Sequence, residues 1–275
     1  MKWVNAAIVA AVAVVVVVAA SITLLPRVEP VDLEELKSSL VNSLSGVETM
    51  RQEAHMTVST GGAQYVVEMS LVELIDYRGQ KASFNVTMTV KSTPIATPVN
   101  TTIYLYYVNK TVYFAQEIPG APLAWYKQVA PEELWSQLFT NPANITSMFL
   151  NASDLEYLGV DVVNGVECFV VDVKPRMSEL VNMTSLILGP QLTGTLRQLG
   201  VEDLSELIKD LDIKMWISKS DYLPLKQVMS MTMNIMNMDF QVSAETTLSY
   251  NLPISISLPE EAYNATPVQQ EYPCG

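Results

Sequence analysis

Histidine and cysteine are scarce in this sequence, and their scarcity excludes several kinds of catalytic site. The 275 residues include one histidine, His55, and two cysteines, Cys168 and Cys274. A zinc site built on histidines, or a metalloprotease helix, needs more imidazoles than the chain contains. The sequence also lacks the G-x-S-x-G, P-loop, G-x-G-x-x-G and EF-hand patterns. We therefore expect no enzyme activity, no cofactor and no metal site.

Basic residues are also few: 16 Lys and Arg stand against 29 Asp and Glu, which gives a net charge of -13. Such a chain is repelled by nucleic acids and by anionic membrane surfaces, so we expect no nucleic-acid partner. The paired glutamates at 34–35, 132–133 and 260–261 fall at helix starts or in the tail, where the helix dipole or water stabilises them. A glycosidase carboxylate pair forms only in three dimensions, so this alternative stays open.

Charge is absent altogether from Ala6 to Leu25, between Lys2 and Arg27. About 20 apolar residues match the thickness of the bilayer core, whereas the apolar core of a signal peptide is usually about 7 to 15 residues long. We favour an uncleaved single-pass anchor over residues 1–27, with a domain over residues 28–275 outside the cell membrane. Cleavage near Ala19-Ala20-Ser21 is the alternative, and it would leave a secreted protein.

Glycosylation sequons support an external location. Each is an N-x-S/T sequence without proline in the middle, an acceptor pattern that requires exposure, and their asparagines are Asn85, Asn100, Asn109, Asn144, Asn151, Asn182 and Asn264. The alternative is a strand surface rich in Thr and Asn that produces the pattern by chance. In an oxidising exterior Cys168 and Cys274 would form a disulfide, unless Cys168 is simply a small buried apolar residue.

Two long alternating segments, over residues 225–235 and 238–248, organise the rest of the chain. Apolar residues occupy every second position, which predicts half-buried strands joined by a tight hairpin. Methionine is frequent on their apolar side, and its flexible side chain suits either an irregular core or a surface for apolar ligands of varied shape. The candidates for lining or covering such a cavity are Trp135, Phe139, Met148, Met229, Met231, Met233, Phe240 and Val242.

Further alternating segments predict a mainly β domain of the α+β class. Hairpins are expected at Asn109-Lys110 and at Asn164-Gly165, and residues 92–99, which include two prolines, are expected to form a loop. An amphipathic helix is predicted after Asp32 and another after Pro131, with a short third helix around residues 145–150. Two more helices are predicted over residues 177–188 and 201–211. No linker divides the domain.

Three motifs in the second half of the chain resemble those of the LolA/LppX-like lipoprotein-carrier superfamily. They are WISKSDYLPLK at residues 216–226, EYLGVDVVNGVECFVVDVKP at residues 156–175, and SLPEEAYNA at residues 257–265. The resemblance implies a curved antiparallel half-barrel, an incompletely closed β barrel, whose concave face is covered by helices and accommodates lipid chains. The chain lacks the lipid-acceptor cysteine of the bacterial lipoproteins. We expect a membrane-anchored relative from an archaeon, with a transmembrane helix before the half-barrel.

Two functional hypotheses follow. In the first, the protein is a cell-surface carrier or chaperone that binds a lipid or another long apolar molecule by burial. In the second, its own helices fill the same fold, and the protein is an extracytoplasmic interaction or sensing module whose partner is another protein.

Overall fold

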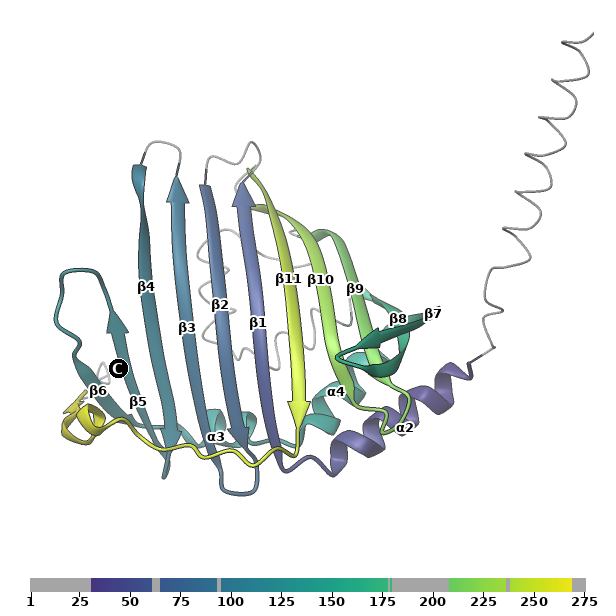
Figure 1. The fold of residues 1–275 in the computed structure, drawn as a ribbon, viewed down its shortest axis with the longest axis horizontal. Coiled ribbons are helices and arrows are strands. Elements are labelled where there is room, and N and C mark those ends of the chain that lie inside the picture. Colours follow the sequence, from purple (N-terminus) through teal and green to yellow (C-terminus); the bar gives the residue numbers. More distant parts are fainter. Residues whose placement is uncertain are drawn as a thin grey trace, which may run out of the picture. The chain divides into compact units, whose positions relative to one another are not determined.

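A single sheet of twelve strands dominates the computed structural model, which describes residues 31–60, 65–92, 95–177, 179, 208–235 and 238–268 (Figure 1). The strands are β1 (Thr49–Thr60), β2 (Tyr65–Asp76), β3 (Lys81–Ser92), β4 (Ile95–Val108), β5 (Thr111–Glu117), β6 (Trp125–Val129), β7 (Ser153–Val163), β8 (Val166–Pro175), β9 (Ile208–Ser218), β10 (Pro224–Ile235), β11 (Met238–Tyr250) and β12 (Thr266–Pro267). The helices are α2 (Leu33–Ser45), α3 (Glu132–Leu138), α4 (Pro142–Asn151) and the 3₁₀ turn η1 (Glu260–Asn264).

The strand order is β12-β6-β5-β4-β3-β2-β1-β11-β10-β9-β8-β7. The sheet is curved, and its two edges, β7 and β12, lie at opposite ends, so it is not closed (Figure 1). The predicted mainly β, half-barrel architecture is confirmed at this level. The described strands pair antiparallel as expected, except at one edge, where the two residues of β12 pair in parallel with β6.

The predicted hairpins are confirmed by their backbone angles. Asn164 and Gly165 have φ values of 51° and 83°, and Asn109 and Lys110 have φ values of 53° and 57°. Positive φ at both central residues is the requirement of a type I′ turn, whose twist matches that of the paired strands. Between β10 and β11 the ladder runs up to the pair Ile235 and Met238, as the change of alternation predicted.

Helices pack against the two ends of the sheet. α2 buries Leu36, Leu40 and Leu44 and contacts α4, and both helices also contact β7. α3 contributes Trp135, which is 4% exposed and packs with Val112 of β5 and with Ala130. The start of α4 is capped by Asn141, whose side-chain oxygen accepts a hydrogen bond from the backbone N–H of Ala143 at 2.8 Å. The helices that the structure describes therefore cover only the two ends of one face of the sheet and leave its middle uncovered by them.

The opposite face is covered at the β4–β6 end by the segment that contains η1. Ala262 and Ala265 pack there against Ala115 and Trp125, with three tyrosines and Leu258 around them. This explains why SLPEEAYNA, although far away in the sequence, ends beside β6: its small alanines allow the turn to approach the aromatic rings closely.

Two predicted boundaries are wrong. The segment expected to be a loop, residues 92–99, contains the start of β4, because Val99 pairs with Val90 and Ile95 with Ser92 across an irregular step in the register. The helix predicted over residues 201–211 is wrong for residues 208–211, which begin β9. Leu211 pairs there with Met231 of β10, and this pairing overrides the local helical spacing.

Other predictions fall outside the described residues. They include the apolar segment Ala6–Leu25, most of the helix predicted over residues 177–188, and residues 201–207. Within the ranges that the structure does describe, no helix is long and apolar enough to cross a membrane.

Candidate functional site

One face of the sheet is apolar across most of its width, and the strand registers arrange its side chains in rows. We call it the apolar face. The methionine row crosses β3, β2, β1, β11, β10 and β9, in that order, and consists of Met88, Met69, Met56, Ala244, Met229 and Ile213. The row beside it consists of Val90, Val67, Val58, Val242, Met231 and Leu211. These rows combine residues from the whole length of the domain.

The middle of the apolar face is less buried than its ends. Val171 and Val173 of β8 have 0% exposure, and Trp135 closes the β5 end. By contrast Met56, Met69, Met88 and Met229 are each only half-buried. A close-packed core leaves its central side chains without exposed surface, so the middle of this face is not packed in that way.

The predicted cavity residues divide into two groups. Met229, Met231, Met233 and Phe240 are half-buried on the apolar face, and Val242 is buried there at 5% exposure. Trp135 and Phe139 lie with ring centroids 4.8 Å apart in the small core over β5, while Met148 of α4 is 43% exposed. The indole N–H of Trp135 also donates to Gln80 Oε1 at 3.2 Å. The structure therefore does not bring the helix residues together with the methionines of β10.

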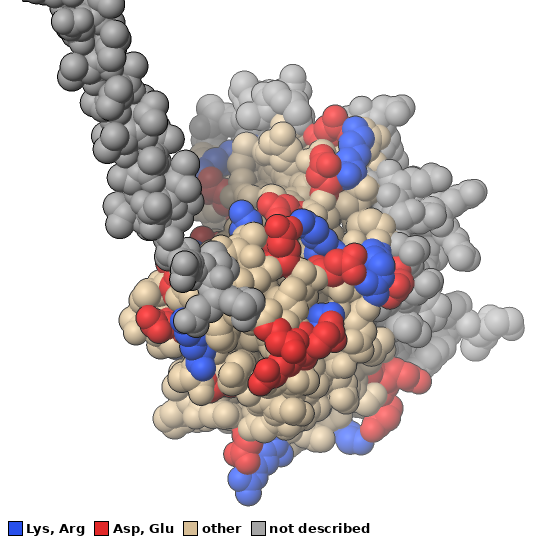
Figure 2. All heavy atoms as spheres, turned by 90° about the vertical axis from the view of Figure 1, so that its right-hand side faces the viewer, with Lys and Arg blue, Asp and Glu red and all other residues tan. Residues whose placement is uncertain are grey.

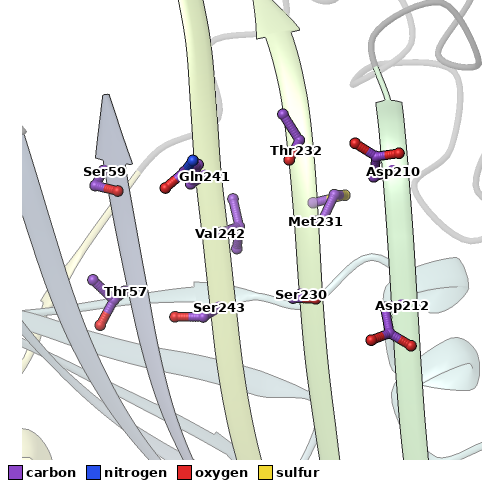
Figure 3. Close-up of a pocket in the computed structure, with 10 residues that line it drawn as sticks. All are labelled: Thr57, Ser59, Asp210, Asp212, Ser230, Met231, Thr232, Gln241, Val242 and Ser243. Carbon is purple, nitrogen blue, oxygen red and sulfur yellow. The ribbon is translucent and has the colours of Figure 1, made fainter. Parts of the chain in front are cut away.

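The side of the sheet opposite the apolar face, which we call the polar face, carries a depression that we did not predict. Its volume is about 280 Å³, and Figure 3 shows its lining: Thr57, Ser59, Asp210, Asp212, Ser230, Met231, Thr232, Gln241, Val242 and Ser243. Most of these side chains are polar, and they come from β1, β11, β10 and β9. Met231 and Val242 complete the lining although the alternation assigns them to the apolar face. Only the strand order brings these segments together, so no local pattern could have identified them.

The polar face carries charges of both signs, since Lys91 pairs there with Glu68 and Lys226 with Glu245. Basic side chains also lie next to acidic ones on the side of the molecule where β7 lies (Figure 2). Lys226 Nζ is 2.9 Å from Glu245 Oε1 and lies 5.3 Å from the ring centroid of Trp216, within the motif WISKSDYLPLK. The indole N–H of Trp216 donates to Asp161 Oδ2 at 2.9 Å, and this bond holds the pKa of Asp161 below its ordinary value. These contacts join the two motif hairpins.

The carboxylates do not assemble into a metal site. In the part of the chain that the structure describes, no group of three or more His, Cys, Asp or Glu residues is arranged to hold a metal ion, and this includes Asp210 and Asp212. His55 is exposed, and its Nδ1 lies 3.0 Å from Ser70 Oγ.

The predicted modification sites are placed as follows. Six of the sequon asparagines are exposed, namely Asn85, Asn100, Asn109, Asn144, Asn151 and Asn264, and Asn182 lies outside the described residues. Cys168 is buried, which raises the pKa of its thiol, and Cys274 also lies outside the described residues. Glycosylation and the disulfide therefore stay predictions.

No family model and no curated protein sequence matches the chain. Among solved structures, lipoprotein LppX of Mycobacterium tuberculosis is 9% identical with a TM-score of 0.40, and the alignment covers 82% of this chain and 99% of that chain. An outer membrane lipoprotein-sorting protein domain from Vibrio parahaemolyticus is 11% identical with a TM-score of 0.24, covering 84% and 95%. A DUF1329 family protein from Desulfovibrio piger is 10% identical with a TM-score of 0.25, covering 81% and 94%.

At TM-scores of 0.40 and below, these similarities establish neither a superfamily nor a function for the chain. They do not test the archaeal source that we expect.

Proposed function

We propose that the protein is a carrier or chaperone for a lipid or another long apolar molecule, which it binds on the apolar face without catalysing a reaction. The observation that carries this proposal is the methionine row, whose side chains remain half-buried in the middle of the sheet while both ends are packed. Each methylene group that a ligand buries there contributes about 0.8 kcal/mol. A long chain would thus be held reversibly, and flexible methionines would adapt to its shape.

A pair of neighbouring substitutions tests this site. Met229 lies in the methionine row, whereas Ser230, the next residue of β10, lines the depression on the polar face. We expect Met229→Trp to weaken binding of the neutral apolar reporter N-phenyl-1-naphthylamine by about tenfold, equivalent to about 1.4 kcal/mol, because the indole would occupy the ligand's place. Fluorescence titration measures the affinity, and thermal unfolding measures stability.

Ser230→Trp is the matched control, since it adds the same ring to the same strand on the opposite face. Loss of binding in Ser230→Trp alone would place the ligand in the polar depression and contradict the proposal. A close-packed core at Met229 would instead appear as overpacking, with stability lowered by about 1 to 3 kcal/mol, in a protein whose wild type does not bind the reporter.

One observation favours the second hypothesis, a protein partner. Leu158, Val160 and Val162 of the edge strand β7 are exposed by 43%, 49% and 57%. An edge strand presents unpaired backbone groups, and an apolar edge is a common site for strand addition by another chain. Val160→Lys should then abolish capture of a protein partner and leave reporter binding unchanged, whereas unchanged capture would exclude this edge.

We propose an external, membrane-anchored location for the protein. The supporting features are the uncharged segment Ala6–Leu25 and the exposure of the described sequon asparagines. Sugar-sized increments in the intact mass of protein from its own cells would support this location, and a bare sequence mass would count against it.

A further inference from the structure

In the part of the apolar face that β1 to β5, β10 and β11 form, the one carboxylate is that of Glu73. Strand alternation puts Glu73 of β2 on the same face as Leu71 and Ile75, and the registers place Gln52 of β1 on one side of it and Phe84 of β3 on the other. On β1 to β5, β10 and β11, Glu73 is the only acidic or basic residue on this face. Towards the β7 edge, β8 adds Glu167, whose Oε2 lies 3.8 Å from Lys219 Nζ. An acid among the apolar residues of a sheet face has no role in ordinary packing.

Glu73 has no hydrogen-bond or ion-pair partner among the described residues, unlike acids of the polar face. Glu68, on the same strand but facing the other way, forms a salt bridge with Lys91, and Glu245 forms one with Lys226. Removing a carboxylate from water without giving it a partner is costly. Loss of hydration accordingly raises the pKa of Glu73 to about 7.

The surroundings of Glu73 give the apolar face a polar end. Gln52 supplies an uncharged amide beside it. Burial, together with the nearby charge of Glu73, raises the pKa of the Tyr77 phenol. The Tyr77 hydroxyl donates a hydrogen bond to Met50 Sδ at 3.9 Å. The methionine row lies four residues along β2, at Met69. The layout matches an amphiphile whose tail lies on the rows and whose head lies at Glu73.

We propose that Glu73, together with Gln52, binds the head group of the ligand, and that this head group donates hydrogen bonds, as a protonated long-chain amine does. This inference rests on the proposed function. An ionised carboxylate only accepts hydrogen bonds and favours a positive charge within about 4 to 6 Å. A fatty-acid carboxylate or a phosphate in the same place would be repelled.

The test compares two ligands of equal chain length, hexadecylamine and palmitate, as competitors of N-phenyl-1-naphthylamine at about pH 8, where Glu73 is ionised. In the full-length wild type we expect the amine to displace the reporter at a concentration about tenfold lower than palmitate. Glu73→Gln keeps the shape of the side chain but removes its charge, so it should abolish this preference. Glu68→Gln is the matched control on the polar face and should keep the preference.

The outcomes separate this inference from the function on which it rests. A wild type that does not bind the reporter contradicts the carrier function and the head-group site with it. A second outcome is that the wild type binds the reporter but Glu73→Gln keeps the wild-type ratio of amine to palmitate affinity. This result overturns the head-group site alone. Equal loss of the preference in Glu68→Gln would assign it to the overall negative charge and likewise overturn the site.

Discussion

Among single residues, we expect Glu73 to contribute to the pH dependence of stability. Burial raises its pKa from 4.5 to about 7, while the nearby Tyr77 and Tyr250, whose pKa values burial also raises, stay protonated in this range. As the pH rises from 4.5 to 7, the carboxyl group ionises in the unfolded chain but remains protonated in the folded protein. The free energy of unfolding should therefore fall across this window and level off above it.

Glu73→Gln should remove this part of the slope, so that the fall between about pH 4.5 and pH 7 becomes smaller by about 1 to 3 kcal/mol. Urea denaturation at a series of pH values measures it. Parallel profiles for wild type and variant would show that water reaches the carboxylate freely and that its pKa is ordinary.

The sequence predicts the face of Glu73 but not its environment. Alternation through Val67, Met69 and Leu71 assigns the residue two positions further on to the apolar side. Whether that carboxylate loses its water depends on Gln52 and Phe84, which are supplied by other strands. For the same reason, strand alternation around Met56, Met69 and Met88 does not show that these residues share one row with Met229.

Among the secondary-structure elements, the hairpin between β7 and β8 depends on its turn glycine. Gly165 has a φ value of 83°, and a Cβ atom added there would meet no atom within 4 Å. The cost of Gly165→Ala is therefore conformational strain alone, and we expect a loss of about 1 kcal/mol or slightly more in thermal or urea unfolding.

Gly46→Ala is the control, because Gly46 does not have positive φ and an added Cβ would lie 3.7 Å from Ser43 O, an ordinary contact. It should be neutral or slightly stabilising. Equal losses in both variants would show that the left-handed turn at Gly165 contributes nothing specific.

Elements with strong local patterns were predictable, whereas their ends often were not. α2 follows from its leucine spacing, and the type I′ turn follows from Asn164-Gly165. The start of β4 was missed because its prolines indicated a loop, although pairing with β3 carries the strand through Pro98. The start of β9 was missed because residues 208–211 continue a helical spacing that pairing with β10 overrides.

For the whole molecule, the alternating segments and the three motifs were enough to predict a curved, open sheet. The sequence did not reveal which neighbours each strand has. The order β1-β11-β10-β9 joins residue 57 to residue 241 and to residues 210 and 230, and so creates the depression on the polar face. It also creates the methionine row. The sequence could therefore predict a methionine-rich apolar surface, but not which residues of the different strands form it.

Native mass spectrometry tests the central claim, that the apolar face holds an apolar ligand, most directly. The sample is the chain from Val28 onward, produced in its own cells and purified without detergent. We predict masses above that of the glycosylated or unmodified chain by one lipid-sized molecule, which is released on gentle collisional activation, and loss of these adducts in Met229→Trp but not in Ser230→Trp. A folded protein that shows only its own mass, in both wild type and variants, would contradict the account.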